Sequence, residues 1–552
     1  MSYLFGLDWQ FNWWSLIWSG ATIFAILHIP SVLLSRGARP MSVLAWILCL
    51  LALPFIGVIL WWMIGRRHVE RRRRRRKASH AEMTRSLADI KGQISAQHQS
   101  ESGAELVAAD DIFDSSDLFC LRQNEGIFAA TPGNLVHVLP SGAQAFDAFE
   151  AAVRAATEHI HFQFYIWQKD AVGRRFRDLL TEKARAGVEV RVLYDAVGGS
   201  PVSRGFMKPL IEAGGHVAPF MPLSFFARQL SINFRNHRKI IVIDRRVSFI
   251  GGINIGEEYL DWVDMAFRFE GPISLQLQET FVEDWYFATH QDLGARRYFL
   301  PEEGQKNATL ALALAQAQTS DDSLEFATPI HPALDQMPGT QQVKNRGGKL
   351  HFRAKEPPPA PDPLEPLKLT GVTGRLIAGG PDWPDSPIES VFFLAITRAV
   401  KRLFIATPYF VPDEAILLAI KTAALRGVDV RILTAGRSDV WLAQAAGRSF
   451  YEELLRTGVR IYEYSEQMLH AKAVVVDEDW VVVGSANMDI RSFDLNFEVN
   501  ATLEDRDLNR YMSAYITSYM TVSREMSLRD FVHRPLKKRI LESTARLFSP
   551  LL

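Results

Sequence analysis

Apolar and charged positions divide the chain into an amino-terminal part and a much longer remainder. Residues 13–34 and 41–64 contain no Asp, Glu, Lys or Arg. Each stretch exceeds the roughly twenty apolar residues that cross a bilayer as a helix. We therefore expect two membrane-spanning helices within residues 1–68, joined by the short loop SRGARP. A cleaved signal peptide is the alternative for the first stretch, but no basic segment precedes it and the second stretch would remain.

The remainder alternates short β-branched runs with helical patterns, and this alternation occurs twice. Residues 148–167 and 390–410 each have the pattern of a helix followed by a strand. Residues 184–195 and 424–435 each have the pattern of a helix end, a glycine and another strand. The repeat predicts an α/β protein with two pseudo-symmetric halves, each a mixed sheet flanked by helices and both sharing one active site.

Composition gives the expected boundaries between these parts. Residues 69–112 are charged and helical in pattern, which is typical of a polybasic tether. Residues 301–370 are rich in Ala, Gln, Pro and Gly, which favours a partly disordered linker or insertion. The halves are then 113–300 and 371–552. The second half ends in a basic amphipathic helix that either lies on a membrane or packs on the domain.

One polar pattern occurs in both halves, around a β-branched run that should be buried. The segment NHRKIIVID places His237, Lys239 and Asp244 around residues 240–243, and HAKAVVVD repeats this spacing. A glycine and an asparagine follow each histidine at the same two distances. The matched positions are Gly251 and Asn254 in the first half, and His470, Lys472, Asp477, Gly484 and Asn487 in the second. Five positions that recur in register indicate one shared function.

Alternation along a strand separates the roles of the motif residues. Side chains point to opposite faces in turn, so each histidine and the lysine two residues later lie on one face. Asp244 and Asp477, the third members of the catalytic motif, lie an odd number of residues away, and we assign them to structure. One histidine–lysine set cannot both attack a substrate and protonate its leaving group. We therefore expect the halves to face each other around a single site.

A nucleophilic imidazole needs an acceptor on its second nitrogen, which fixes its tautomer and orientation. The candidates are carboxylates in the strand after each motif: Asp264 or Glu270 after the first, and Glu498 after the second. We expect Asp264 and Glu498, because they lie at similar distances beyond their histidines.

Two imidazoles, two ammonium groups and two amides at one spot suit a phosphoryl group, whose negative charge they offset. One imidazole would attack phosphorus to form a phosphohistidine. The other would protonate the leaving oxygen and then deprotonate the incoming alcohol. The chain has no His/Cys cluster and no HExxH motif, and the lysines supply the positive charge that a divalent ion would bring. We therefore expect no metal and no other cofactor.

These residues resemble the signature of the phospholipase D superfamily, H-x-K-x4-D followed by G-[GS]-x-N. The resemblance covers most of the chain from about residue 133. It implies that His237 is the nucleophile and His470 the acid and base. It also implies a substrate-binding set around the phosphate: Lys239, Asn254, Lys472, Ser485 and Asn487. Gly252 stands where many members have a serine like Ser485, so one hydroxyl contact is expected to be missing from the first half.

The two expected spans narrow the resemblance to the bacterial cardiolipin synthases. The segments SANMDIRSFDLNFEVN, WVDMAFRFEGP and RLFSPLL are similar to segments of that family. The resemblance implies a phosphatidyltransferase that acts on membrane phospholipids, moving a phosphatidyl group from one phosphatidylglycerol to another and so forming cardiolipin and glycerol. A hydrolytic phospholipase D is the main alternative. A nucleic-acid phosphodiesterase and a non-catalytic scaffold are more distant ones.

Charge gives the expected partners and orientation. The 62 Lys and Arg balance the 62 Asp and Glu, so the chain lacks the general basic surface of a nucleic-acid-binding protein. A polybasic run from Arg71 to Lys77 follows the second apolar stretch, whereas the loop between the stretches carries only Arg36 and Arg39. The positive-inside rule then predicts a multi-pass protein of the bacterial inner membrane with a cytoplasmic catalytic part.

Overall fold

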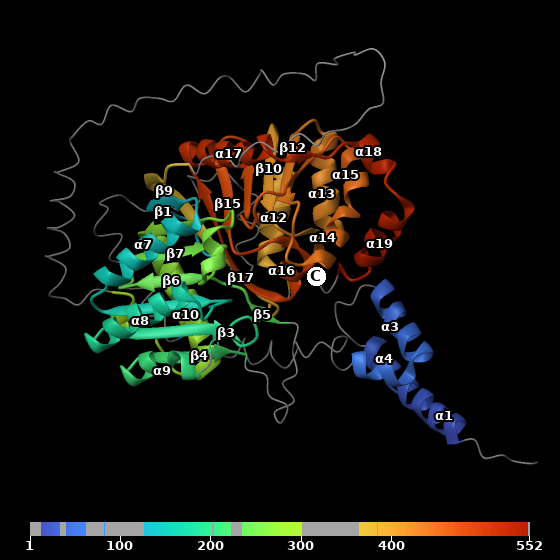
Figure 1. Cartoon of the computed structure of the whole chain (residues 1–552), viewed down its shortest axis with the longest axis horizontal. Helices are drawn as coiled ribbons and strands as arrows, with labels where there is room; N and C mark the ends of the chain where they lie inside the picture. The colour runs from blue at the N-terminus through green and yellow to red at the C-terminus, as the bar shows by residue number, and fades with distance from the viewer. Residues whose placement is uncertain are drawn as a thin grey trace, which may run out of the picture.

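The computed structural model describes residues 13–33, 40–61, 82, 85, 126–200, 202, 204–221, 234–300, 364–383 and 385–549. Figure 1 shows two α/β halves side by side and a separate group of apolar helices. The expected tether at 69–112 lies outside the described residues except for 82 and 85. The expected linker at 301–370 lies outside them except for 364–370. The domain boundaries drawn through these segments stay predictions.

Both halves contribute strands in the same succession. The first half has β1 (Thr131–Leu139), β2 (His159–Phe164), β3 (Glu189–Asp195), β4 (His216–Phe220), β5 (Arg235–Asn236), β6 (Ile240–Ile243), β7 (Val247–Gly251) and β8 (Ala266–Glu270). The second has β9 (Leu367–Gly379), β10 (Arg402–Thr407), β11 (Phe410–Val411), β12 (Asp429–Ala435), β13 (Arg460–Tyr464), β14 (Ala473–Val476), β15 (Trp480–Gly484), β16 (Met488–Asp489), β17 (Asn496–Glu504) and β18 (Arg524–Glu525).

One sheet runs through both halves. Its main path is β18-β13-β12-β10-β14-β15-β17-β9-β1-β8-β7-β6-β2-β3-β4, with the antiparallel pair β1 and β9 at its centre. Outward from this pair, β8, β7, β6, β2, β3 and β4 correspond one by one to β17, β15, β14, β10, β12 and β13. The repeat in the sequence is therefore a pseudo-twofold repeat in space, which confirms the predicted fold class.

Helices cover both faces of the sheet. The first half has α7 (Gly142–Ala155), α8 (Ala171–Arg185), α9 (Arg204–Glu212) and α10 (Pro272–Thr289), with short 3-10 turns η3 (Glu257–Leu260) and η4 (Arg296–Tyr298). The second has α12 (Pro387–Arg398), α13 (Glu414–Leu425), α14 (Trp441–Arg448), α15 (Tyr451–Arg456), α16 (Ile490–Asp494), α17 (Arg506–Thr521), α18 (Leu528–Val532) and α19 (Leu536–Arg546).

Strand alternation sorts the apolar side chains between these layers. In β10, Leu403 and Ile405 belong to the core under α12 and α13, whereas Phe404 and Ala406 belong to the core under α17. The α17 core also contains Ile273 of α10, so it continues across β9 and β1 into the first half. A shared core on this face holds the two halves at a fixed distance, which any site between them requires.

Asp244 and Asp477 hold the sheet together at the strand ends away from the histidines. Each follows its strand in the left-handed region, with φ of 49° and 48°, a conformation that Asp tolerates. Asp244 accepts three backbone N–H groups, from residues 157–159, at 2.8 Å each. Asp477 accepts the N–H groups of residues 400–402 at 2.7 to 3.1 Å. Each carboxylate therefore ties its turn to the start of β2 or β10.

The amino-terminal helices agree with the first expected span and differ from the second. The helices there are α1 (Trp13–Ile26), α2 (Ile29–Leu33), α3 (Pro40–Ala52) and α4 (Pro54–Leu60). By length and apolarity, Leu16–Leu33 is a candidate span, whereas Val43–Ala52 is shorter. Pro54 lacks the N–H that would continue α3, and α4 packs against α3 so closely that a Cβ at Gly57 would lie 2.7 Å from the Cys49 carbonyl oxygen.

We predict that Asp244→Asn lowers stability. An amide cannot accept the same set of N–H donors, because its NH2 group would face one of them. Losing one or two buried hydrogen bonds should reduce the free energy of unfolding by about 1–3 kcal/mol. Thermal and denaturant unfolding of the full chain in detergent micelles measure this. Unchanged stability together with lost turnover would instead give Asp244 a direct role in the chemistry.

Candidate active site

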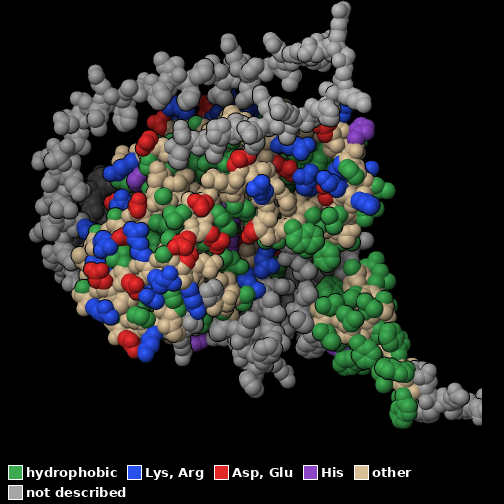
Figure 2. Space-filling model, in the orientation of Figure 1, with side chains coloured by type: hydrophobic (Ala, Val, Ile, Leu, Met, Phe, Trp, Pro, Cys, Tyr) green, Lys and Arg blue, Asp and Glu red, His purple; other side chains and the backbone are tan. Residues whose placement is uncertain are grey.

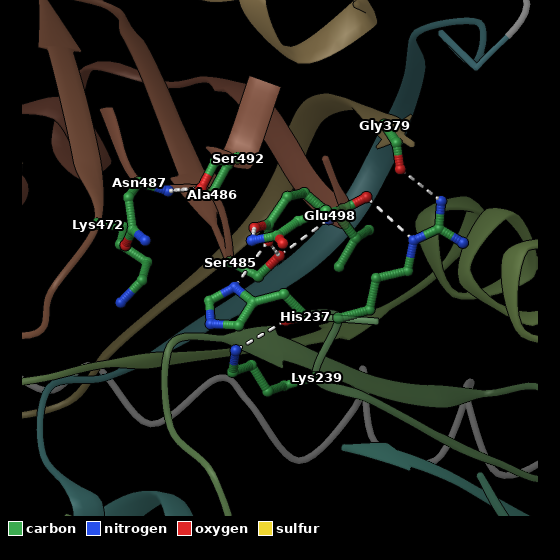
Figure 3. A network of polar contacts seen from close by, with 12 residues as sticks. His237, Lys239, Gly379, Lys472, Ser485, Ala486, Asn487, Ser492 and Glu498 are labelled. Atoms are coloured by element: carbon green, nitrogen blue, oxygen red, sulfur yellow. Dashed lines mark hydrogen bonds and ion pairs between the residues drawn. The ribbon is translucent and has the colours of Figure 1, made fainter. Parts of the chain in front are cut away.

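The two motifs lie in extended segments just before buried strands. Strand β6 begins at Ile240 and β14 at Ala473, so each histidine and lysine precedes its strand and does not lie within it. Lys239 Nζ donates to the carbonyl oxygen of His237 at 2.7 Å, and Lys472 makes the matching bond to His470. These four side chains are buried. Figure 3 shows Lys472 across from His237 and Lys239, in one region between the halves.

Each histidine is held by the half to which it does not belong. His237 Nδ1 lies 3.0 Å from Glu498 Oε2, and His470 Nδ1 lies 2.6 Å from Asp264 Oδ2. The two expected carboxylates are therefore the acceptors, but they are exchanged between the halves. Each follows one motif in sequence and binds the histidine of the other. Glu270 takes no part: it forms an ion pair with Arg268 on β8.

Backbone pairing between the halves explains the exchange. Strand β5 pairs in parallel with the start of β17, and the His237 N–H donates to the Phe497 carbonyl at 2.9 Å. In the same way the His470 N–H donates to the Val263 carbonyl at 2.8 Å. Phe497 and Val263 directly precede Glu498 and Asp264. The backbone bond therefore sets each carboxylate beside the ring that it accepts from.

Glu498 and Asp264 have different hydrogen-bond partners, and the difference is related to the glycine at position 252. Glu498 also accepts the Ser485 hydroxyl at 2.5 Å and the Asn496 amide at 3.0 Å. Asp264 accepts its own neighbour's N–H, from Met265, at 2.8 Å. A Cβ at Gly252 would lie 2.3 Å from both Asp264 carboxylate oxygens. The serine found at 485 therefore has no room at 252, and the expected loss of one hydroxyl contact follows from the position of Asp264.

The remaining substrate-binding candidates take up different positions. The Ser485 hydroxyl donates to Glu498 and accepts the Val499 N–H, so it holds the carboxylate. The Asn254 side-chain oxygen accepts the Ile166 N–H at 3.1 Å. The Asn487 side-chain oxygen is buried and has no hydrogen-bond partner among the described residues. This oxygen can accept a hydrogen bond, such as one from a hydroxyl group of a ligand.

Burial and nearby positive charges lower the pKa values of the two histidines and the two lysines in this site. The pKa of His237 and that of His470 are both lowered to about 4, mainly by burial and also by both lysines, although Glu498 and Asp264 raise them. Burial also lowers the pKa of Lys239 to about 7 and that of Lys472 to about 8. Burial alone would raise the pKa of Glu498, yet His237 and Lys239 bring it below its usual value. Each lysine lowers the pKa of the histidine in the other motif, so the two motifs lie close enough to share one substrate.

This charge pattern suits an anionic ligand. Neutral imidazole is the nucleophilic form, and a low pKa provides it at neutral pH. An arriving phosphate would raise the pKa of the lysines and of the second imidazole, because opposite charge favours their protonated forms. The site would then gain the proton that a general acid needs. No cluster of three or more metal-ligating side chains occurs in the described part of the chain.

Aromatic rings beside the histidines were missed by the motif analysis. Tyr165 lies edge-on to His237 with ring centroids 4.9 Å apart, and Trp262 lies edge-on to His470 at 5.0 Å. Tyr409 lies 6.4 Å from His470, and its hydroxyl donates to Asp439 at 2.5 Å. No spacing rule identifies these rings. Their only sequence signal is that each lies close to the end of a predicted strand or next to a motif carboxylate.

Comparisons with known proteins agree with this geometry. Residues 150–285 and 393–520 match a family model described as the cardiolipin synthase, phospholipase D-like domain. Residues 20–66 match a phospholipase D-nuclease amino-terminal model. A cardiolipin synthase of Geobacillus sp. is 34% identical over 96% of this chain and 92% of its own length. A cardiolipin synthase of Halalkalibacterium halodurans is 32% identical over 100% of this chain and 96% of its own length. A solved structure, phosphatidylserine synthase of Haemophilus influenzae, has a TM-score of 0.51 at 15% identity, covering 76% of this chain and 97% of its own, which shows a shared fold.

We predict that Gly252→Ala impairs the site. The added Cβ must push the Asp264 carboxylate away, and His470 then loses its fixed orientation. Turnover should fall by at least about tenfold, since small displacements of catalytic groups have effects of that size. The matched variant Ser485→Ala removes a hydroxyl from the opposite half without adding an atom, and should cost less. Equal turnover of Gly252→Ala and the unaltered protein, measured on folded material, would show that Asp264 does not position His470.

We also predict that anion binding weakens as pH rises. A bound anion favours protonated lysines, and the free-site pKa values are about 7 for Lys239 and about 8 for Lys472. Affinity should fall as pH rises, by up to roughly tenfold per pH unit for each proton taken up. The fall should be shallow below pH 7, where only His470 gains a proton on binding, and steeper above pH 7, where the lysines gain protons too. Sulfate is a suitable probe because its charge is constant over this range. Affinity that rises or stays flat between pH 7 and 9 would contradict the lowered lysine pKa values.

Proposed function

This chain belongs to the cardiolipin synthase family of phospholipase D-like proteins, and we propose that it transfers a phosphatidyl group between two phosphatidylglycerol molecules through a covalent phosphohistidine. It has the phosphatidyltransferase function of that family and acts on membrane phospholipids. The observation that carries the mechanism is the pair of buried imidazoles, each bonded through Nδ1 to a carboxylate of the opposite half. This arrangement leaves Nε2 of each ring available for the substrate.

The first step breaks the bond between phosphorus and the glycerol headgroup. His237 Nε2 attacks phosphorus, and the Glu498 carboxylate stabilises the positive charge that develops on the ring. His470, protonated on binding of the anionic substrate, gives its proton to the departing glycerol oxygen. Lys239 and Lys472 offset the charge on the phosphoryl oxygens. The products of this step are free glycerol and a phosphatidyl group bonded to His237.

The second step reverses these roles around a new alcohol. His470, now neutral, takes the proton from a hydroxyl of a second phosphatidylglycerol. The oxygen bonds to phosphorus, the bond between phosphorus and His237 breaks, and cardiolipin leaves. The site is then in its starting protonation state. Water in place of the lipid alcohol would give phosphatidic acid, which is the reaction of the hydrolytic alternative.

Exclusion of water favours transfer over hydrolysis. The catalytic side chains are almost fully buried, with His237 9% and His470 4% exposed. Tyr165, Trp262 and Tyr409 surround them with rings that leave little space for solvent. Because water is abundant, a transferase must hold its acceptor in place, and positioning of this kind is worth several kcal/mol.

Membrane attachment would supply both lipids at high local concentration. The candidate span at Leu16–Leu33 and the apolar helices α3 and α4 support attachment at the amino terminus. The positive-inside rule, applied to the run from Arg71 to Lys77, supports a multi-pass arrangement in the inner membrane with the two halves in the cytoplasm.

Trapping the covalent intermediate tests this mechanism. We expect a phosphatidyl substrate with p-nitrophenol as its leaving group to modify His237 in a His470→Ala protein, because this leaving group departs without a general acid. The intermediate should persist, since His470 is needed to activate the acceptor. Mass spectrometry of peptides locates the modified residue.

The same preparation distinguishes the alternatives. His237→Ala should give no covalent product, and the unaltered protein should convert phosphatidylglycerol into cardiolipin and glycerol. Modification of His470 in place of His237 would reverse the assigned roles. Phosphatidic acid as the main product would support the hydrolytic phospholipase D.

A further inference from the structure

Helix α19 is amphipathic in the reverse of the usual sense. A surface helix ordinarily turns its apolar stripe toward the core and its charged face toward water. In α19 the inward side chains are Glu542 and Ala545, which are 4% and 1% exposed. Its apolar residues face outward: Leu536 is 68% exposed, Ile540 57% and the following Leu547 77%. The helix therefore presents an apolar stripe to its surroundings.

Ion pairs fix α19 in this orientation. Glu542 pairs with Arg448 of α14 at 3.3 Å and with Arg534 at 2.7 Å. Arg546 lies over the Phe450 ring at 4.1 Å. Buried charges of this kind require their partners, so turning the helix to bury its leucines would separate Glu542 from both Arg448 and Arg534. The outward apolar stripe is thus a consequence of specific contacts on the other side.

Helix α14, which packs against α19, carries a further exposed aromatic side chain. Trp441 opens α14 and is 64% exposed, and Phe548 just beyond α19 is 46% exposed. We call Trp441, Leu536, Ile540, Leu547 and Phe548 together the docking face. Figure 2 shows hydrophobic side chains gathered over this edge of the second half. Figure 1 places α19 on the side of the molecule where α1, α3 and α4 lie.

Basic side chains border the docking face. At 100° per residue, Lys537 and Arg539 fall on either side of the line from Leu536 to Ile540, and both are exposed. An apolar stripe between lysine and arginine is the pattern of a helix that lies in a membrane interface, where the cations meet anionic headgroups. Phosphatidylglycerol, the substrate in the proposed function, carries such a headgroup.

One member of the docking face lies close in the chain to a residue that is linked to the catalytic centre. Asp439, two residues before Trp441, accepts the Tyr409 hydroxyl, and the Tyr409 ring packs on His470. A bilayer against Trp441 would therefore lie on the side of the second half from which Asp439 and Tyr409 lead to His470. Lipid headgroups could reach the histidines while their acyl chains stayed in the membrane.

We propose that the docking face inserts into the surface of an anionic lipid bilayer and so holds the second half, with its catalytic histidine, against the membrane that supplies the substrate. This contact is separate from the amino-terminal helices. It rests on the proposed function for its purpose, whereas the contact itself can be measured without any turnover.

A lipid-borne quencher tests the contact directly. Full-length protein with Cys49 and Cys120 replaced by alanine carries a fluorophore at Leu536→Cys or, as a matched control, at Leu425→Cys. Leu425 is 71% exposed and is the last residue of α13. It lies near the start of β12, at the strand ends opposite those next to the histidines. In vesicles of phosphatidylglycerol and phosphatidylcholine that contain nitroxide-labelled lipid, we expect quenching at 536 and none at 425.

Either of two other outcomes would overturn the proposal. Absence of quenching at 536 would mean that a second copy, or another segment of this chain, covers the docking face. Equal quenching at both positions would mean that the face has no special relation to the bilayer.

Kinetics with two forms of substrate provide an independent test. Leu536→Glu should lower cardiolipin formation from vesicle phosphatidylglycerol by roughly tenfold, because a charge opposes insertion. It should leave turnover of a monomeric short-chain phosphatidylglycerol unchanged, and Leu425→Glu should change neither. Equal losses on both substrates would contradict a docking role. Failure of the proposed function would look different, since the unaltered protein would then form no cardiolipin from either substrate.

Discussion

The site depends on one constraint: each catalytic imidazole is bonded to a carboxylate that the other half provides. His237 and Glu498 come from opposite halves, as do His470 and Asp264. Buried ionisable groups are costly unless they are paired, so neither half can hold its histidine in a productive state alone. The continuous sheet through β1 and β9 and the shared core beneath α10 and α17 keep the partners in register. The active site therefore forms only when the fold brings these four side chains together.

The pseudo-twofold symmetry is broken where the reaction needs two different histidines. Glu498 accepts His237, Ser485 and Asn496, whereas Asp264 accepts His470 and the Met265 N–H. The shorter acid lies directly against Gly252, in space that a serine would occupy. The extra donors should keep Glu498 ionised, which suits a carboxylate beside the ring that becomes positively charged on attack. The difference supports His237 as the nucleophile.

Much of this arrangement could be predicted from the sequence, because repeats and strand patterns are local signals. The doubled motif indicated the fold and the family, both confirmed, and selected Asp264 and Glu498 as acceptors. The exchange of these carboxylates between halves could not be predicted, since it depends on backbone pairing of residues more than 200 positions apart. The break at Pro54 and the inward Glu542 of α19 were missed for a related reason. Apolar patterns identify a stripe, but ion pairs and packing decide which way it faces.

Nitrogen-15 NMR of the two catalytic rings tests the exchanged pairing most directly. In protein labelled at histidine, the resonances of His237 and His470 are assigned from single His→Gln variants and followed through a pH titration. The exchanged pairing predicts that Glu498→Gln alters the tautomer and further lowers the pKa of His237 alone, and that Asp264→Asn does so for His470 alone. Glu498→Gln acting on His470, with His237 unchanged, would contradict the account.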